Sequence, residues 1–271
     1  MGYGAAVDLA GSTVLLTGAS GGIGKAIARA LAARGARVIL TGRRADVLEE
    51  LRAELGDRAT VIEADLADAA TVRDLPARAG PVDALVANAA LPASGRVDSF
   101  SEEEIDRALE VNLRAPIQLA RALSPGMVER GRGHLVFVSS LSGKISSGGS
   151  AIYSATKFGL RAFGAGLRED LLGSGVGVTT VYPGFISDAG MFAETDVKLP
   201  PGVGTRTPEA VADAVVRGIE QNKSELEVAP FGMRLGARLW GLSPSGVGAI
   251  QRKLGSLKIA DALAEGQREK R

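Results

Sequence analysis

The stretch Thr13-Val-Leu-Leu-Thr-Gly-Ala-Ser-Gly-Gly-Ile-Gly24 decides the fold of this chain. A β-branched, apolar run ending at Thr17 passes into a glycine-rich turn, and an Ala-rich, helix-like segment follows. Glycine permits a positive-φ turn, and its missing side chain lets backbone amides approach a pyrophosphate at a helix N-terminus. The spacing is TGxxxGxG rather than GxGxxG. We therefore expect a phosphate-binding strand–turn–helix unit, with a ligand-free glycine corner as the alternative.

Further short apolar runs alternate with periodic segments rich in Ala, Leu, Arg and Glu, which indicate strands and helices in turn. Parallel strands need such crossovers, and the nearly continuous apolar character of the runs is typical of a sheet covered on both faces. We expect a doubly wound α/β domain with no linker dividing it. Besides Thr13–Thr17, the expected strands are Arg37–Thr41, Thr60–Ala64, Ala84–Ala87, Leu135–Ser139, Val176–Tyr182 and Glu225–Ala229.

Composition excludes several classes of function. The chain has 271 residues, a formal net charge of +1 and no cysteine, so neither nucleic-acid binding nor thiolate chemistry is indicated. The only histidine, His134, opens an apolar run and is expected at a strand entrance, and we expect no metal site. Residues 1–8 show no signal-peptide pattern, and no apolar run is long enough to span a bilayer. We expect a cytoplasmic protein.

The residues at the end of the second expected strand indicate which nucleotide the chain binds. In this type of fold an acidic residue about twenty positions past the glycine turn binds a ribose 2′-hydroxyl. Gly42 occupies that place, and Arg43 and Arg44 follow it. Guanidinium groups suit a 2′-phosphate. The pattern favours NADP(H) over NAD(H), unless both arginines are merely solvated.

Tyr153 and Lys157 stand four residues apart, which on a helix puts both side chains on one face. A phenol with a pKa of about 10 is a poor acid or base at neutral pH unless a nearby cation favours its phenolate. We expect Lys157 to lower the pKa of Tyr153, so that the tyrosine exchanges a proton with an alcohol or carbonyl oxygen. An accidental spacing is the alternative.

Asn112 lies in a helix-like stretch, and Pro116 follows four residues later. Proline cannot donate the helical hydrogen bond to the carbonyl of residue 112, and it disturbs the helix there. We expect a kink that frees the Asn112 carbonyl to bind another group.

Taken together, these motifs resemble the short-chain dehydrogenase/reductase family in its compact form. The resemblance covers residues 12 to about 229 and implies a Rossmann-type parallel sheet of about seven strands, flanked by helices on both faces. The residues that carry it are the turn Thr17–Gly24, Asp65-Leu66, Asn88-Ala89-Ala90, Asn112, Ser140, Tyr153, Lys157 and Pro183-Gly184.

The resemblance implies roles for single positions. Asp65 would bind the adenine amino group, and Asn88-Ala89-Ala90 would place backbone against the adenosine ribose and steady the central sheet. Ser140, thirteen residues before Tyr153, would orient the substrate; Ser139 is its alternative, followed by Ser142. Lys157 would also bond the nicotinamide ribose. The expected cofactor-binding residues are Gly18, Ser20, Gly21, Gly22, Ile23, Gly24, Arg43, Arg44, Asp65, Leu66, Asn88, Ala89, Tyr153, Lys157, Pro183, Gly184 and Ile186.

Two departures from the family pattern are visible. Ala90 stands where the family more often has Gly, and Asp188 stands where it often has a Thr that bonds the cofactor carboxamide. The backbone of Ile186 is the remaining carboxamide partner.

The implied reaction joins a hydride from NADPH to a substrate carbonyl carbon while Tyr153 protonates the oxygen, with Ser140 positioning that oxygen. A water on Asn112 would resupply the proton. The loop 185–206 is long enough to act as a lid. We expect a hydrophobic or amphipathic ketone or secondary alcohol in an apolar pocket lined by Leu91, Leu141, Ile145, Phe185, Met191 and Phe192; packing of the loop alone is the alternative.

The chain continues beyond Ala229 with apolar and basic residues at helical spacing. We expect residues 1–229 to form the catalytic domain and residues 230–271 an amphipathic helical extension. Its partner is the domain itself, a second subunit of a homodimer or homotetramer, or a membrane surface.

Other functions on this fold remain open. An NADP(H)-sensing regulatory protein would tend to lose the Tyr or Lys that this chain retains. An epimerase or dehydratase of the extended branch would carry a larger C-terminal domain. Within the reductase interpretation, a ketoacyl carrier-protein reductase is possible.

Overall fold

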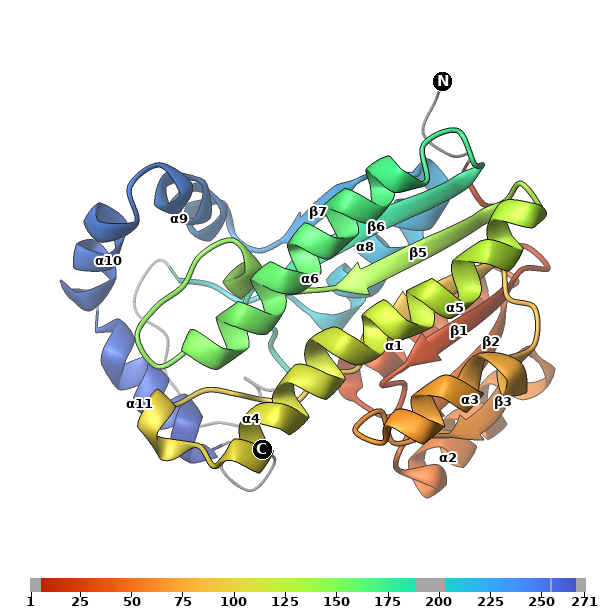
Figure 1. Ribbon diagram of the computed structural model, residues 1–271, viewed down its shortest axis with the longest axis horizontal. Helices are drawn as coiled ribbons and strands as arrows, with labels where there is room; N and C mark the ends of the chain where they lie inside the picture. Colours follow the sequence, from red (N-terminus) through yellow and green to blue (C-terminus); the bar gives the residue numbers. More distant parts are fainter. Residues whose placement is uncertain (1–5, 189–202, 254, 267–271) are drawn as a thin grey trace.

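Seven parallel strands form one sheet in the computed structural model, which describes residues 6–188, 203–253 and 255–266 (Figure 1). The strand order is β3-β2-β1-β4-β5-β6-β7. All the expected strands are confirmed, with ends shifted by no more than two residues. Their bounds are β1 Thr13–Thr17, β2 Arg37–Gly42, β3 Ala59–Glu63, β4 Ala84–Ala87, β5 Gly133–Val138, β6 Val176–Pro183 and β7 Glu225–Val228.

Helices cover both faces of the sheet, as the apolar strands predict. One face is covered by α1 (Gly22–Ala33), α2 (Ala45–Leu55) and α8 (Pro208–Gln221). The other is covered by α3 (Ala69–Ala79), α5 (Ala115–Glu129) and α6 (Ala151–Asp170). The helix α4 (Glu102–Leu109) joins α5 through a π-helical turn, Glu110–Arg114, and short 3₁₀ turns lie at Gly56–Arg58, Val97–Ser99 and Leu141–Gly143.

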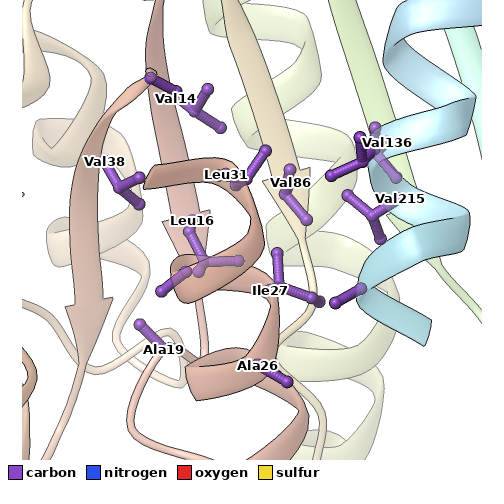
Figure 2. Close-up of a cluster of buried hydrophobic side chains, with 14 of the residues drawn as sticks. Val14, Leu16, Ala19, Ala26, Ile27, Leu31, Val38, Val86, Val136 and Val215 are labelled. Carbon is purple, nitrogen blue, oxygen red and sulfur yellow. The ribbon is translucent and has the colours of Figure 1, made fainter. Parts of the chain in front are cut away.

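Alternate residues of each strand supply the two cores. Val14 and Leu16 of β1 point to the layer of α1 and α8, whereas Leu15 points to the layer of α3, α5 and α6. Figure 2 shows the first layer, where Ile27 and Leu31 of α1 meet valines from neighbouring strands. A fully buried Leu or Ile of this kind contributes roughly 1.5–3 kcal/mol.

The strand order positions the site. From β1 the next strands are added on one side, as β2 and β3, and from β4 they are added on the other side, as β5, β6 and β7. The strand order therefore reverses between the neighbours β1 and β4. In doubly wound sheets, ligands bind at such a point, beyond the carboxyl ends of the strands. The glycine turn, Asn88, Ser140 and Pro183-Gly184 all lie at or just past those ends.

His134 lies inside β5 and is buried, in agreement with its expected place in a strand. Its Nε2 lies 2.7 Å from the Thr179 hydroxyl, and burial lowers the pKa of His134 to about 3. The residue is therefore a neutral core group.

The chain continues past β7 as α9 (Phe231–Leu242), α10 (Pro244–Lys253) and α11 (Ser256–Gly266). Figure 1 shows these helices as an arc on the side of the molecule where α6 begins. In the described part of the chain, no helix combines the length and the apolar character needed to cross a membrane. The expected helical C-terminal region is confirmed.

Candidate active site

Tyr153 and Lys157 lie one turn apart near the start of α6 and face each other. The Lys157 Nζ is 5.6 Å from the centroid of the Tyr153 ring. The same ammonium donates a hydrogen bond to the Val138 carbonyl at the end of β5, at 3.1 Å. The helix spacing therefore produces the expected pair and fastens it to the central sheet.

Lys157 is almost completely buried, with 2% of its surface exposed. Burial disfavours a charged amine, and it lowers the pKa of Lys157 to about 8. The ammonium thus remains the major form at neutral pH, close to the point at which it loses its proton.

The pKa of Tyr153 differs from our expectation. Burial raises it to about 12, while the hydrogen-bonding Ser140 side chain acts in the opposite direction. Lys157 does not overcome the desolvation of the phenol in this structure, because its ammonium lies beside the ring face and bonds a backbone carbonyl. Tyr153 is consequently protonated at neutral pH, a state suited to donating a proton.

The structure separates the three candidate serines. The Ser139 hydroxyl is buried and donates to the Lys157 carbonyl at 3.0 Å, so it is committed to holding α6 against β5. The Ser140 hydroxyl is half-buried, interacts with Tyr153 and lies 3.5 Å from the Pro183 carbonyl. It also accepts the Ser142 amide at 3.1 Å. These contacts favour Ser140, which sits at the start of the Leu141–Gly143 turn.

Asn112 lies in the π-helical turn Glu110–Arg114. The irregularity that we expected before Pro116 is therefore a π-helical turn. A π-helical turn shifts the backbone bonding by one residue and accommodates an irregularity without ending the helix. The buried Asn112 side chain accepts the Leu91 amide at 2.6 Å and donates to the Leu91 carbonyl at 2.9 Å. It thereby fixes the segment after β4, a role that the sequence did not suggest.

The glycine turn after β1 fits a phosphate group. Gly18 has φ +67°, and a Cβ there would lie 2.7 Å from the Ala89 Cα; a Cβ at Gly24 would lie 2.1 Å from the Gly18 carbonyl oxygen. The first turn of α1 has no acidic residue and no side-chain cap. Its amides are therefore available to an anion, as the dipole of a helix N-terminus favours. Ser20, Gly21, Gly22 and Ile23 complete this turn and are all at least partly exposed.

Arg44 lies beside the glycine turn. Its guanidinium donates to the Ser20 carbonyl at 2.5 Å, and the Ala19 amide bonds the Thr41 carbonyl at the end of β2. Arg43 is exposed at the same edge. Gly42 is packed closely enough that a Cβ there would lie 3.1 Å from the Ser20 Oγ. The structure thus brings Arg44 to the glycine turn, and the exposed Arg43 precedes it in the chain.

The remaining expected cofactor positions lie along the same edge. Asp65 is exposed after β3 and accepts the Ala67 amide at 3.0 Å, while Leu66 is buried. Asn88 donates to the carbonyls of Thr17 and Gly18, both at 3.2 Å. The Thr17 hydroxyl accepts the amides of Asn88 and Ala89, both at 3.1 Å. Thr17 thus connects the ends of β1 and β4. We did not predict this role, and the only indication of it in the sequence is that a polar residue ends an apolar strand.

After β6, the half-buried Gly184 follows Pro183, and Ile186 is buried in a short bridge with Arg206. Asp188 is exposed with φ +61°. The segment around Ile186 is thus held by backbone hydrogen bonds to Arg206. That the Ile186 backbone bonds the cofactor carboxamide stays a prediction.

The expected substrate residues do not form a single cluster. Leu91 packs into the core beneath α5 and α6, whereas Leu141 and Ile145 pack with Ala229, Met233 and Ala237. Phe185 is half-buried, and Met191 and Phe192 lie outside the described residues. Leu91 is drawn into the core because its backbone is bonded to Asn112. The apolar residues that follow Ser140 are therefore packed against α9, a contact that the sequence did not indicate.

The pKa of Lys157 generates a prediction for stability. The folded pKa of about 8 lies below the ordinary 10.5. Between these values the unfolded chain binds more protons, so the free energy of unfolding rises with pH. Relative to Lys157→Met, the wild type should gain up to about 3 kcal/mol across this window. Urea unfolding of both proteins between pH 7 and pH 11 measures the difference, and parallel pH profiles would contradict the buried, pKa-shifted lysine.

Comparison with known proteins agrees with this geometry. The family model described as short chain dehydrogenase matches residues 12–199. The "Ketoacyl reductase HetN" of Nostoc sp. is 35% identical over 272 residues, which cover 96% of this chain and 94% of that protein. The match therefore includes α9 and α10. The "NADP-dependent 3-hydroxy acid dehydrogenase YdfG" of Escherichia coli O6:H1 is 35% identical over 74% of this chain and 86% of that protein.

Solved structures show the same likeness. A short-chain dehydrogenase from Sphingobium yanoikuyae in complex with NADPH superposes with a TM-score of 0.74 at 30% identity, covering 86% of this chain and 96% of that chain. A structure titled as a putative betaketoacyl-ACP reductase gives a TM-score of 0.76 at 31% identity, covering 83% and 99% of the two chains. With Ser140, Tyr153 and Lys157 brought together at the carboxyl edge of a seven-stranded parallel sheet, this chain belongs to the short-chain dehydrogenase family of oxidoreductases.

Proposed function

We propose that the chain reduces a ketone or aldehyde to an alcohol, or catalyses the reverse reaction, with Tyr153 as the acid or base. The observation that carries this proposal is the grouping of Tyr153 with Ser140 and with the buried side chain of Lys157. A regulatory protein that only senses the nucleotide would not need these groups together.

The cofactor is NADP(H) in preference to NAD(H). Two relatives support this assignment, since one is named as NADP-dependent and a solved structure contains NADPH. The glycine turn and the start of α1 would hold the pyrophosphate, and Arg43 and Arg44 would hold the 2′-phosphate. When bound, the cofactor supplies or accepts the hydride.

Side chains of the protein would then position the carbonyl oxygen of the substrate and supply its proton. Tyr153 would donate a proton to the carbonyl oxygen as the alcohol forms, and Ser140 would hold that oxygen in place. Lys157 would stabilise the phenolate that Tyr153 leaves behind, because its ammonium already faces the ring. We keep the expectation that the Asn112 carbonyl holds a water that resupplies the proton.

For the substrate we propose a hydrophobic or acyl ketone. Ile145 lies five residues after Ser140 and Phe185 directly after Pro183-Gly184, and both are half-buried apolar side chains, whereas Leu141 is buried against Ala229 and Ala237. The names of two relatives, a ketoacyl reductase and a 3-hydroxy acid dehydrogenase, point to acyl substrates of this kind.

Tyr153→Phe tests the proposed reaction. With the proton donor removed and the ring retained, kcat/KM for NADPH-dependent reduction should fall roughly 100-fold or more. The Kd for NADPH, measured by fluorescence titration, should change little. The substrate for this assay is the fastest ketone in a panel of lipophilic ketones, acyl esters and small ketoacids. Near-normal turnover with intact NADPH binding would contradict the assignment.

We further propose that α9 brings the protein to an anionic membrane surface. Phe231, Leu235, Leu239 and Leu242 share one helix face and are 72%, 44%, 46% and 84% exposed. No acidic residue occurs between Glu227 and Asp261, whereas that stretch carries five Lys or Arg residues. An apolar helix face flanked by cations is suited to anionic lipid. The expected cytoplasmic location and a homodimer or homotetramer stay predictions.

Vesicle sedimentation tests the membrane contact. Full-length protein should bind vesicles containing phosphatidylglycerol more strongly than pure phosphatidylcholine. Replacing both Leu235 and Leu239 with Ser should weaken binding at least about tenfold, because two leucines leave the lipid. Val128→Ser with Leu172→Ser is the matched control, since these side chains are 40% and 39% exposed elsewhere. If instead no vesicle binds and the α9 variant dissociates an oligomer in sedimentation velocity, this face belongs to a subunit interface.

A further inference from the structure

Helix α9 carries a second apolar face, which packs on the catalytic domain. Met233, Ala237 and Trp240 recur at helical spacing on the side opposite Leu235 and Leu239. Met233 and Ala237 belong to one cluster with Leu141, Ile145 and Ala229. The Trp240 ring lies 5.5 Å from the Phe158 ring, measured between centroids. The inward face of α9 therefore contacts the same end of the molecule as the active site.

These contacts fall on the residues that directly follow the site residues. Leu141 follows Ser140, Phe158 follows Lys157, and Gly184 follows Pro183. A Cβ at Gly184 would lie 3.0 Å from the Ala229 Cβ and 3.4 Å from the Met233 methyl carbon, so Gly184 packs closely against Ala229 and is within contact distance of α9. One helix thus packs against all three segments that carry the proposed catalytic groups and the end of β6.

A group of charges fastens α9 to the turn that carries Ser140. We name it the Glu227 cluster, and it consists of Lys144, Glu225, Glu227 and Arg234. Lys144 lies 2.7 Å from Glu225 and 2.9 Å from Glu227, and Arg234 of α9 lies 3.1 Å from Glu227. The Lys144 ammonium also makes a cation–π contact with the buried Tyr182 ring, 4.1 Å from its centroid.

The geometry of the cluster makes Glu227 its central member. Its side chain is 9% exposed and is the only carboxylate of the cluster that contacts both Lys144 and Arg234. Burial acts to raise the pKa of Glu227, but Lys144 and Arg234 outweigh this effect and keep the pKa below its ordinary value. The charge is thus retained at neutral pH. Removing one partner of such a buried pair leaves the other charges without full compensation.

We propose that α9 is a positioning element of the active site and that Glu227 is the positioning residue that couples it, through Lys144, to Ser140. Lys144 lies four residues after Ser140, and its backbone amide closes the Leu141–Gly143 turn on the Leu141 carbonyl at 2.8 Å. A shift of Lys144 would therefore move the turn that begins at Ser140. The proposal rests on the proposed function, because it assigns Ser140 the task of holding the substrate oxygen.

Glu227→Gln in the full-length protein tests the coupling, since it removes the charge and keeps the size. Displacement of Ser140 should lower kcat about tenfold, while the KM for NADPH should change less than kcat, because the glycine turn and the arginines at the β1–β2 edge are not touched, although Gly184 lies next to α9. Glu227→Asp should restore part of the lost kcat. The matched control is Glu54→Gln, which breaks the Arg29–Glu54 pair between α1 and α2, 2.7 Å apart, and should leave kcat unchanged.

Trp240 provides a readout that needs no substrate. It is the only tryptophan of the chain, so intrinsic fluorescence reports its contact with Phe158. Glu227→Gln should shift the emission to longer wavelength as α9 loosens, and Glu54→Gln should not. Arg234→Gln, at a side chain that is 41% exposed, is a milder second variant in case Glu227→Gln does not fold; it should produce the same changes with a smaller amplitude.

The outcomes separate the two proposals. If the wild type turns over no ketone, the proposed function fails, and the emission of Trp240 still decides whether Glu227 holds α9 in place. If both variants fold with unchanged emission and unchanged kcat, Glu227 does not position this site. A weaker affinity for NADPH at unchanged kcat would also overturn the proposal.

Discussion

The buried ammonium group of Lys157 is the constraint on which the site depends. A cation enclosed in protein is costly unless hydrogen bonds satisfy it, and this one donates to the Val138 carbonyl at the end of β5. A hydrogen bond and a close approach of two backbones also join the end of β5 to α6. The Ser139 hydroxyl bonds the Lys157 carbonyl, and a Cβ at Gly143 would lie only 2.6 Å from that oxygen. These contacts hold the end of β5, the turn after it and α6 together, with Ser140 beside Tyr153.

The sheet topology supplies the rest of the site. Because all seven strands are parallel, their carboxyl ends share one edge, and the residues that follow them come together from distant parts of the chain. Thr17 joins β1 to β4, Asn112 holds the segment after β4, and α9 closes the side beyond β6. The helix α9 has two functions in this account. Its inward face supports the catalytic segments, and its outward face, with Leu235 and Leu239, is proposed to meet a membrane.

Local patterns predicted the fold, and they singled out the residues that the structure groups in the candidate site. Strand bounds followed from apolar runs, and the Tyr153–Lys157 pair followed from helical spacing, because both depend on neighbours in the sequence. The sequence could not reveal what depends on distant neighbours. Lys144 meets carboxylates about eighty positions away, and the backbone of Leu91 is held by the side chain of Asn112, twenty-one positions away. The pKa of Tyr153 was predicted in the wrong direction for the same reason, since a motif indicates a nearby cation but not the burial that opposes it.

In the proposed reaction, a hydride passes from NADPH, bound at the carboxyl edge of the sheet, to a carbonyl carbon while the protein protonates the oxygen. Isotope transfer tests it most directly. NADPH labelled with deuterium at one or the other nicotinamide C4 position is incubated with the full-length protein and a ketone that it reduces. We expect deuterium from one of the two labelled forms on the carbinol carbon of the product alcohol. An alcohol product free of deuterium from both labelled forms would contradict it.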